Sequence, residues 1–156
     1  MVRAVCDRDG SGDPADILLV EDNPGDVRLT REAFEDGGID NTLHVATDGV
    51  EALDFLHRRG EYEDAPRPDI VLLDLNLPRK DGDEVLDEIR DDPTLERIPV
   101  IILTSSRAEE DVARSYDLRA NAFLTKPVDP SEFIGVIQSF QQFWLSIVRL
   151  PSCAEE

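Results

Sequence analysis

The sequence predicts an α/β protein with one open parallel sheet and helices on both of its faces. Five short apolar runs alternate with longer amphipathic stretches, an order that favours a βα unit repeated five times. Three of the runs consist almost entirely of branched aliphatic residues, as expected for strands buried on both faces. Because crossovers between parallel strands are right-handed, the helices should form a layer on each side of the sheet. The 156 residues fit one such domain.

The expected strands are short, and turn residues bound the helices between them. The strands should cover residues 17–20, 43–46, 70–73, 100–103 and 122–124. Pro24 suits the first turn of a helix, and Asp48 can cap another. Residues 61–68 are acidic and contain proline, so we expect a solvated loop there. The helices should cover residues 24–36, 48–60, 82–91, 107–118 and 130–150.

The chain is strongly acidic, with a formal net charge of -19. This charge argues against nucleic-acid binding, because there is no basic stripe to neutralise phosphates. A disordered acidic chain is also disfavoured, since 40% of the residues are hydrophobic and show clear periodicity. We expect a folded protein of a high-salt cytoplasm, where a Debye length of about 3 Å at 1 M salt screens surface repulsion. An ordinary acidic protein is the alternative.

Nothing in the sequence indicates a disulfide framework, a structural zinc site or a membrane span. Cys6 and Cys153 lie near opposite ends and form no CxxC pair, so we expect incidental thiols in a reducing cytosol. No apolar run approaches the ~20 residues that a membrane helix needs, and no signal peptide is visible. We expect a cytoplasmic protein with a disordered leader (1–15), one ordered domain (16–148) and a tail (149–156) too short for an output domain.

Polar residues stand where four of the expected strands end. They are Glu21 and Asp22, Asp74, Thr104, and Lys126. Each signal is weak alone, because a carboxylate after a strand is commonly a helix cap and a lone lysine is commonly a surface charge. Together they are informative, because ligands of open α/β sheets bind beyond the carboxyl ends of the strands.

The chemistry that suits this set is phosphoryl transfer. Three clustered carboxylates repel one another unless a cation intervenes, and Mg²⁺ prefers such oxygen ligands. Asp22 and Asp74 could bind the ion directly, and Glu21 through water. Asp74 could then attack a phosphorus atom in line. Lys126 could pair with one phosphoryl oxygen, and the Thr104 hydroxyl could donate a hydrogen bond to another.

Several segments resemble the receiver domains of two-component systems, over about residues 16–148. The segments are 17–22, 72–78, 81–82, 101–105 and 123–127. The resemblance implies a flavodoxin-like (βα)5 three-layer fold with strand order 2-1-3-4-5, one of the common doubly wound arrangements. It also implies that Asp74 accepts a phosphoryl group from the histidine of a sensor kinase. The backbone carbonyl of Asn76 would be a further metal ligand.

A closer likeness is to the single-domain regulators that are paired with phytochrome-like sensor kinases. It depends on residues 22–26, 115–116, 120–121 and 143–144. Two positions depart from the usual receiver pattern. Arg119 stands where glycine is usual, and Phe123 occupies the aromatic switch position where tyrosine is common.

The resemblance also implies how a signal would leave the domain. Thr104 should move toward the phosphoryl group, and Phe123 should enter the space that this opens. The face made by the fourth helix, fifth strand and fifth helix would then change shape. The aromatic last helix, with Phe140, Phe143 and Trp144, favours a homodimer, although ordinary core packing is equally compatible with it.

Smaller features complete these expectations. Asn76 and Ser106 are small and polar, so they should not block water from hydrolysing the phosphoryl group. His44 and His57 do not follow a strand, so we expect structural roles for both.

Three rival functions remain open at this point. A haloacid-dehalogenase-like phosphatase also uses an aspartate nucleophile and Mg²⁺, but its nucleophile follows the first strand. A pseudo-receiver scaffold would normally have lost the acidic pair, the aspartate or the lysine, and all are present here. A phosphate sink, which drains a kinase without any downstream output, is compatible with the sequence.

Overall fold

Five parallel strands form one sheet in the order β2-β1-β3-β4-β5, which confirms the predicted fold class. The strands are β1 Ala15–Val20, β2 Asn41–Ala46, β3 Ile70–Asp74, β4 Val100–Thr104 and β5 Ala122–Thr125. The computed structural model describes residues 15–36, 41–75, 77, 82–104, 108, 120, 122–126 and 129–144. Apart from Ala108, the expected fourth helix lies outside these ranges, and so does the C-terminal tail. The leader also lies outside them apart from Ala15, which pairs with Asn41 in the sheet.

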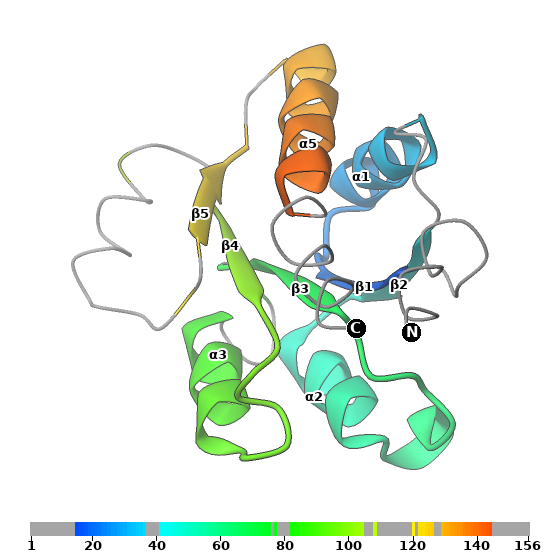
Figure 1. The fold of residues 1–156 in the computed structure, drawn as a ribbon, viewed down its shortest axis with the longest axis vertical. Coiled ribbons are helices and arrows are strands. Elements are labelled where there is room, and N and C mark those ends of the chain that lie inside the picture. The colour runs from blue at the N-terminus through cyan, green and yellow to red at the C-terminus, as the bar shows by residue number, and fades with distance from the viewer. Residues whose placement is uncertain are drawn as a thin grey trace, which may run out of the picture.

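The described helices cover both faces of the sheet. Figure 1 shows α1 and α5 on one face, and α2 and α3 on the other. Their bounds are α1 Pro24–Asp36, α2 Gly49–His57, α3 Gly82–Asp91 and α5 Pro130–Trp144. No helix in the described ranges is long and apolar enough to cross a membrane.

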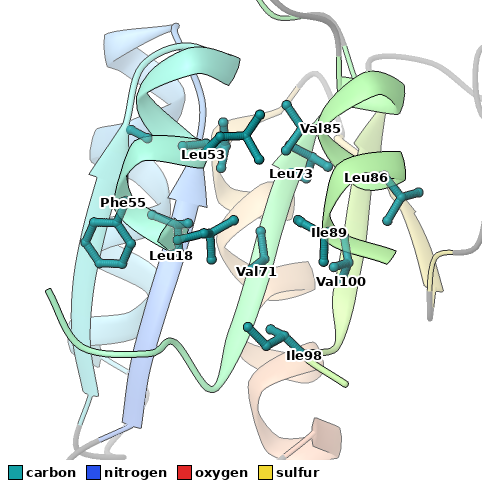
Figure 2. Close-up of a cluster of buried hydrophobic side chains, with 14 of the residues drawn as sticks. Leu18, Leu53, Phe55, Val71, Leu73, Val85, Leu86, Ile89, Ile98 and Val100 are labelled. Atoms are coloured by element: carbon teal, nitrogen blue, oxygen red, sulfur yellow. The ribbon is translucent and has the colours of Figure 1, made fainter. Parts of the chain in front are cut away.

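Alternating residues of the central strands supply two separate hydrophobic cores. Leu18 and Val20 of β1 face α2 and α3, in the cluster that Figure 2 shows. Ile17 and Leu19 belong to the cluster on the opposite face, beside α1 and α5. All four are at most 1% exposed, and β3 and β4 are buried along their whole length. The aliphatic runs therefore give strands with no solvent-facing side, as predicted.

The segment after α2 begins with an ordered turn and continues as the expected loop from residue 63. The helix ends at His57, because Arg58 adopts the left-handed conformation at φ 58° and ψ 48°. A short 3-10 turn, η2 (Gly60–Tyr62), follows. Tyr62 packs its ring 5.5 Å from that of Phe55 and donates a hydrogen bond to Glu51. An apolar contact and a partner for the tyrosine hydroxyl thus order the start of a segment whose composition is acidic.

The two histidines pair with carboxylates away from the strand ends. His44 Nε2 lies 3.0 Å from Asp16 Oδ1, and His57 Nδ1 lies 3.4 Å from Asp92 Oδ2. These contacts agree with the expected structural roles.

Gly82 allows α3 to begin directly against the end of β3. Its N–H donates to the Leu75 carbonyl at 3.1 Å. A Cβ at this position would lie 2.5 Å from the Asp74 carbonyl oxygen and 2.8 Å from the Leu75 Cα. These are backbone atoms, so they cannot swing aside as a flexible side chain would. The absence of a side chain at Gly82 therefore allows the close packing next to Asp74.

We expect Gly82→Ala to lower the free energy of unfolding by about 1–3 kcal/mol, because the added methyl group forces the helix away from the strand. Gly135→Ala is the matched control, since a Cβ there meets nothing within 4 Å and lies in the exposed part of α5. That control should gain up to about 1 kcal/mol from helix propensity. Urea unfolding of both variants checks this, and equal stabilities would contradict the packing argument.

Candidate functional site

The sheet ladder continues one residue past the strands and thereby fixes the residues at their carboxyl ends. The Glu21 N–H donates to the Ala46 carbonyl at 2.9 Å. Between β4 and β5 of the same sheet, the Lys126 N–H donates to the Thr104 carbonyl at 2.8 Å. Asp74 is the last residue of β3, between these two positions. The backbone register thus brings residues from β1, β3 and β5 to one edge.

Three carboxylates form the acidic centre of this edge, which we call the acidic triad: Glu21, Asp22 and Asp74. Each offers one oxygen, and these oxygens all lie within 4.8 Å of one another. Glu21 and Asp74 are buried, at 1% and 6% exposure, whereas Asp22 is exposed. Hard oxygen donors grouped in this way, with one of them exposed to solvent, suit a divalent cation.

Lys126 lies among these carboxylates. Its Nζ is 2.8 Å from Glu21 Oε1 and 3.2 Å from Asp74 Oδ2. A third partner is Asp26 Oδ2, at 2.9 Å. An ammonium group has three N–H donors, so three carboxylates can use its full donor capacity.

Burial and neighbouring charges shift the pKa values of Glu21 and Lys126. Burial raises the pKa of the Glu21 carboxyl from 4.5 to about 7, and the neighbouring Asp74 acts in the same direction. Burial alone would lower the pKa of the Lys126 ammonium. Its hydrogen bonds to Glu21 and Asp26 outweigh that effect and raise the pKa above the usual lysine range. Lys126 is therefore a permanent cation in a site with excess negative charge.

Residues 17–138 match the response regulator receiver domain family. The chain belongs to the receiver family. It is 48% identical over 144 residues to the response regulator Rcp1 of Synechocystis sp., covering 92% of this chain and 98% of Rcp1. Receivers are signalling proteins, so the phosphatase alternative is not supported.

Two solved receiver structures are similar to this one. The Mn²⁺-bound form of Rcp1 has a TM-score of 0.79 at 48% identity, and covers 86% of this chain and 97% of that chain. The phosphorylated cyanobacterial phytochrome response regulator RcpA has a TM-score of 0.79 at 47% identity. The match covers 85% of this chain and 95% of that chain. A receiver with nearly half of its residues in common with this chain thus binds a divalent metal ion.

The structure of this receiver brings together Glu21, Asp22, Asp74 and Lys126. Thr104 ends β4 at the same edge, and its buried hydroxyl lies 3.3 Å from Thr125 Oγ1. Phe123 is half-buried and packs against the core beside α2 and α3. The expected ligand Asn76 lies outside the described residues, as do Ser106 and Arg119.

Asp26 is the member of the cluster that the sequence reasoning did not single out. It lies in the first turn of α1, and its N–H donates to Asn23 Oδ1 at 3.2 Å. The Asn23 side chain also accepts from the Gly25 N–H at 2.8 Å and so caps the helix. Its position shortly after the end of β1 could have indicated that Asp26 belongs to the cluster. Acidic residues in the first turn of a helix are also common for another reason, because they interact favourably with the helix dipole.

The raised pKa of Glu21 predicts a stability that depends on pH. The folded state binds this proton more tightly than the unfolded chain does, so the stabilisation is complete below pH 4.5 and is lost as pH rises through about 7. In EDTA and molar KCl, the free energy of unfolding should fall over this range, and fall less in Glu21→Gln. The exposed Asp64→Asn variant should keep the wild-type profile. If the free energy of unfolding of wild type and Glu21→Gln changed in parallel with pH, this would contradict the raised pKa of Glu21.

Proposed function

We propose that this receiver is a phosphoacceptor response regulator in which Asp74 takes a phosphoryl group from the histidine of a sensor histidine kinase. The observation that carries the proposal is the Lys126 ammonium 3.2 Å from Asp74 Oδ2, at the acidic triad. An Asp74 carboxylate oxygen attacks phosphorus and forms an acyl phosphate. The phosphorus–nitrogen bond breaks, and the imidazole nitrogen keeps the electron pair and then takes up a proton.

We propose Mg²⁺ as the ion of the acidic triad. Its fit is supported by the oxygen donors of Glu21, Asp22 and Asp74, and by the Mn²⁺-bound form of the similar Rcp1. When bound, the ion offsets the charge of the phosphoryl oxygens. Asp22 and Asp74 would hold it directly, Glu21 would act through water, and the family pattern adds the backbone carbonyl of Asn76.

The protein's own residues orient the reaction. Lys126 supplies an N–H to a phosphoryl oxygen, and the Thr104 hydroxyl can turn from Thr125 toward another. Movement of Thr104 would open space for Phe123 and reshape the surface of the fourth helix, β5 and α5. A partner that prefers one shape would then bind according to the phosphorylation state.

We propose that the kinase is of the phytochrome type and that this receiver works in the cytoplasm. Support comes from the 48% identity with Rcp1 and from the similar phytochrome response regulator RcpA. Nucleic acid is not a proposed partner, because a net charge of -19 opposes phosphate binding.

Incubation with acetyl phosphate and Mg²⁺ in molar KCl should produce a shifted band on a phosphate-affinity gel. The band should be absent in Asp74→Asn, which lacks the nucleophile, and absent with EDTA, which removes the ion. Asp64→Asn, an exposed charge change away from the site, should behave as wild type. A shifted band that persists in Asp74→Asn would overturn the assignment of the phosphoacceptor.

We further propose that the protein forms a homodimer through the region of α5, whose sequence contains Phe140, Phe143 and Trp144. Aromatic residues in excess of one helical stripe are typical of contact surfaces. Sedimentation velocity in molar KCl should show a dimer, and Trp144→Glu should shift it to monomer. A monomer both with and without beryllofluoride would remove the dimer from the proposal.

A further inference from the structure

The carboxyl ends of the strands around Asp74, which we call the phosphoacceptor edge, carry many carboxylates. Their formal negative charge exceeds what one divalent metal ion and one lysine would neutralise. Among the residues that the structure describes, four carboxylates lie at this edge, namely the acidic triad and Asp26. The ammonium of Lys126 contacts two members of the triad as well as Asp26. A divalent ion at the triad would compete with Lys126 for the charge of those two members, because both cations lie beside the same carboxylates.

Asp26 differs from the other two lysine partners in its position and exposure. Its side chain is 30% exposed, against 1% for Glu21 and 8% for Asp74. It projects from α1, whereas the other two follow strands of the sheet. The capping bonds from Asn23 fix its backbone, and Thr30 Oγ1 donates to its carbonyl at 2.8 Å. Asp26 is therefore a fixed carboxylate that reaches the lysine without belonging to the acidic triad.

We propose that Asp26 is a positioning residue: it is the counter-ion that keeps Lys126 at the phosphoacceptor edge when a divalent ion occupies the acidic triad. In the metal-free site, Glu21 and Asp74 alone would suffice to hold the ammonium. With the ion bound, their charge is shared, and a like-charged metal ion lies close to the lysine. Asp26 does not share its negative charge with the ion, so it then holds the ammonium. The N-terminus of α1 stabilises this charge.

The inference deepens the proposed function, because a lysine held in this way is ready to donate to the phosphoryl oxygens on Asp74. The alternative is that Asp26 only stabilises the first turn of α1. Asparagine separates the two roles, since it keeps the shape and can accept from Lys126, but lacks the charge. A purely structural role would not depend on whether the metal ion is present.

The ammonium can be observed directly, because the chain contains only two lysines, Lys80 and Lys126. In protein labelled with ¹⁵N-lysine, the Lys126 ammonium signal should be visible without metal, since hydrogen bonds slow its proton exchange with water. Its loss in Lys126→Gln assigns the signal. In the wild type it should persist when Mg²⁺ is added in molar KCl.

In Asp26→Asn the Lys126 signal should remain without metal and should disappear or broaden with Mg²⁺, while Asp26→Glu should restore it. Glu32→Gln on the same helix is the control, because Glu32 pairs with Arg28 rather than with the lysine. Persistence of the signal in Asp26→Asn with Mg²⁺ would overturn the inference. Loss of the signal in wild type with Mg²⁺, or in Asp26→Asn without metal, would overturn it as well.

A second measurement tests whether the pairing of Asp26 with Lys126 affects phosphoryl transfer. With saturating Mg²⁺, the initial rate of phosphorylation by acetyl phosphate should fall about two- to fivefold in Asp26→Asn, as expected for a partly exposed ion pair. In a Lys126→Gln background the same change should have no further effect. An equal effect in both backgrounds would refute the role through Lys126. A wild type that takes up no phosphate would refute the proposed function alone, because the ammonium signals test the inference with Mg²⁺ only.

Discussion

The arrangement of the candidate site depends on the burial of two carboxylates beside a single lysine. Charged groups lose favourable hydration on burial, so Glu21 and Asp74 require a cation. Lys126 supplies this cation, although it lies 105 residues from Glu21 and 52 residues from Asp74 in the sequence. Such buried pairs add little net stability, because desolvation offsets much of the Coulombic gain. Hydrophobic residues would serve the fold at least as well, so the ionic cluster is better explained by the chemistry that it allows.

The scaffold makes this cluster possible by being rigid on both sides. Residues of β1, β3 and β4 alternate between two hydrophobic cores, so neither face of the central sheet can shift without opening a cavity. Gly82 adds a second restraint, since α3 starts in contact with the backbone of Asp74 and Leu75. The backbone of Asp74, the proposed phosphoacceptor, is thus held by the sheet and by the helix that follows it. Positioning of this kind is what phosphoryl transfer requires of a protein.

The parts that could be predicted from the sequence are those that depend on periodicity and strand order. The run Ile17-Leu18-Leu19-Val20 indicates a strand buried on both faces, and four polar strand ends indicate a shared edge. The contact of Asp26 with Lys126 was beyond this reasoning, because it depends on how far α1 brings a side chain toward Lys126. The left-handed Arg58 and the Tyr62–Glu51 contact were missed for another reason. Contacts within residues 51–62 order this segment, whereas its acidic composition favoured a solvated loop.

High surface charge and a buried ionic site respond differently to salt. In molar salt the Debye length is about 3 Å, so an exposed pair such as Arg28 and Glu32 is largely screened. The cluster around Lys126 is screened much less, because its side chain is 12% exposed and two of its partners are buried. Salt that relieves repulsion across a surface of net charge -19 therefore leaves the attraction within the site nearly intact. Asp26 lies between these regimes at 30% exposure, so its pairing with Lys126 is the contact of the site that salt weakens most.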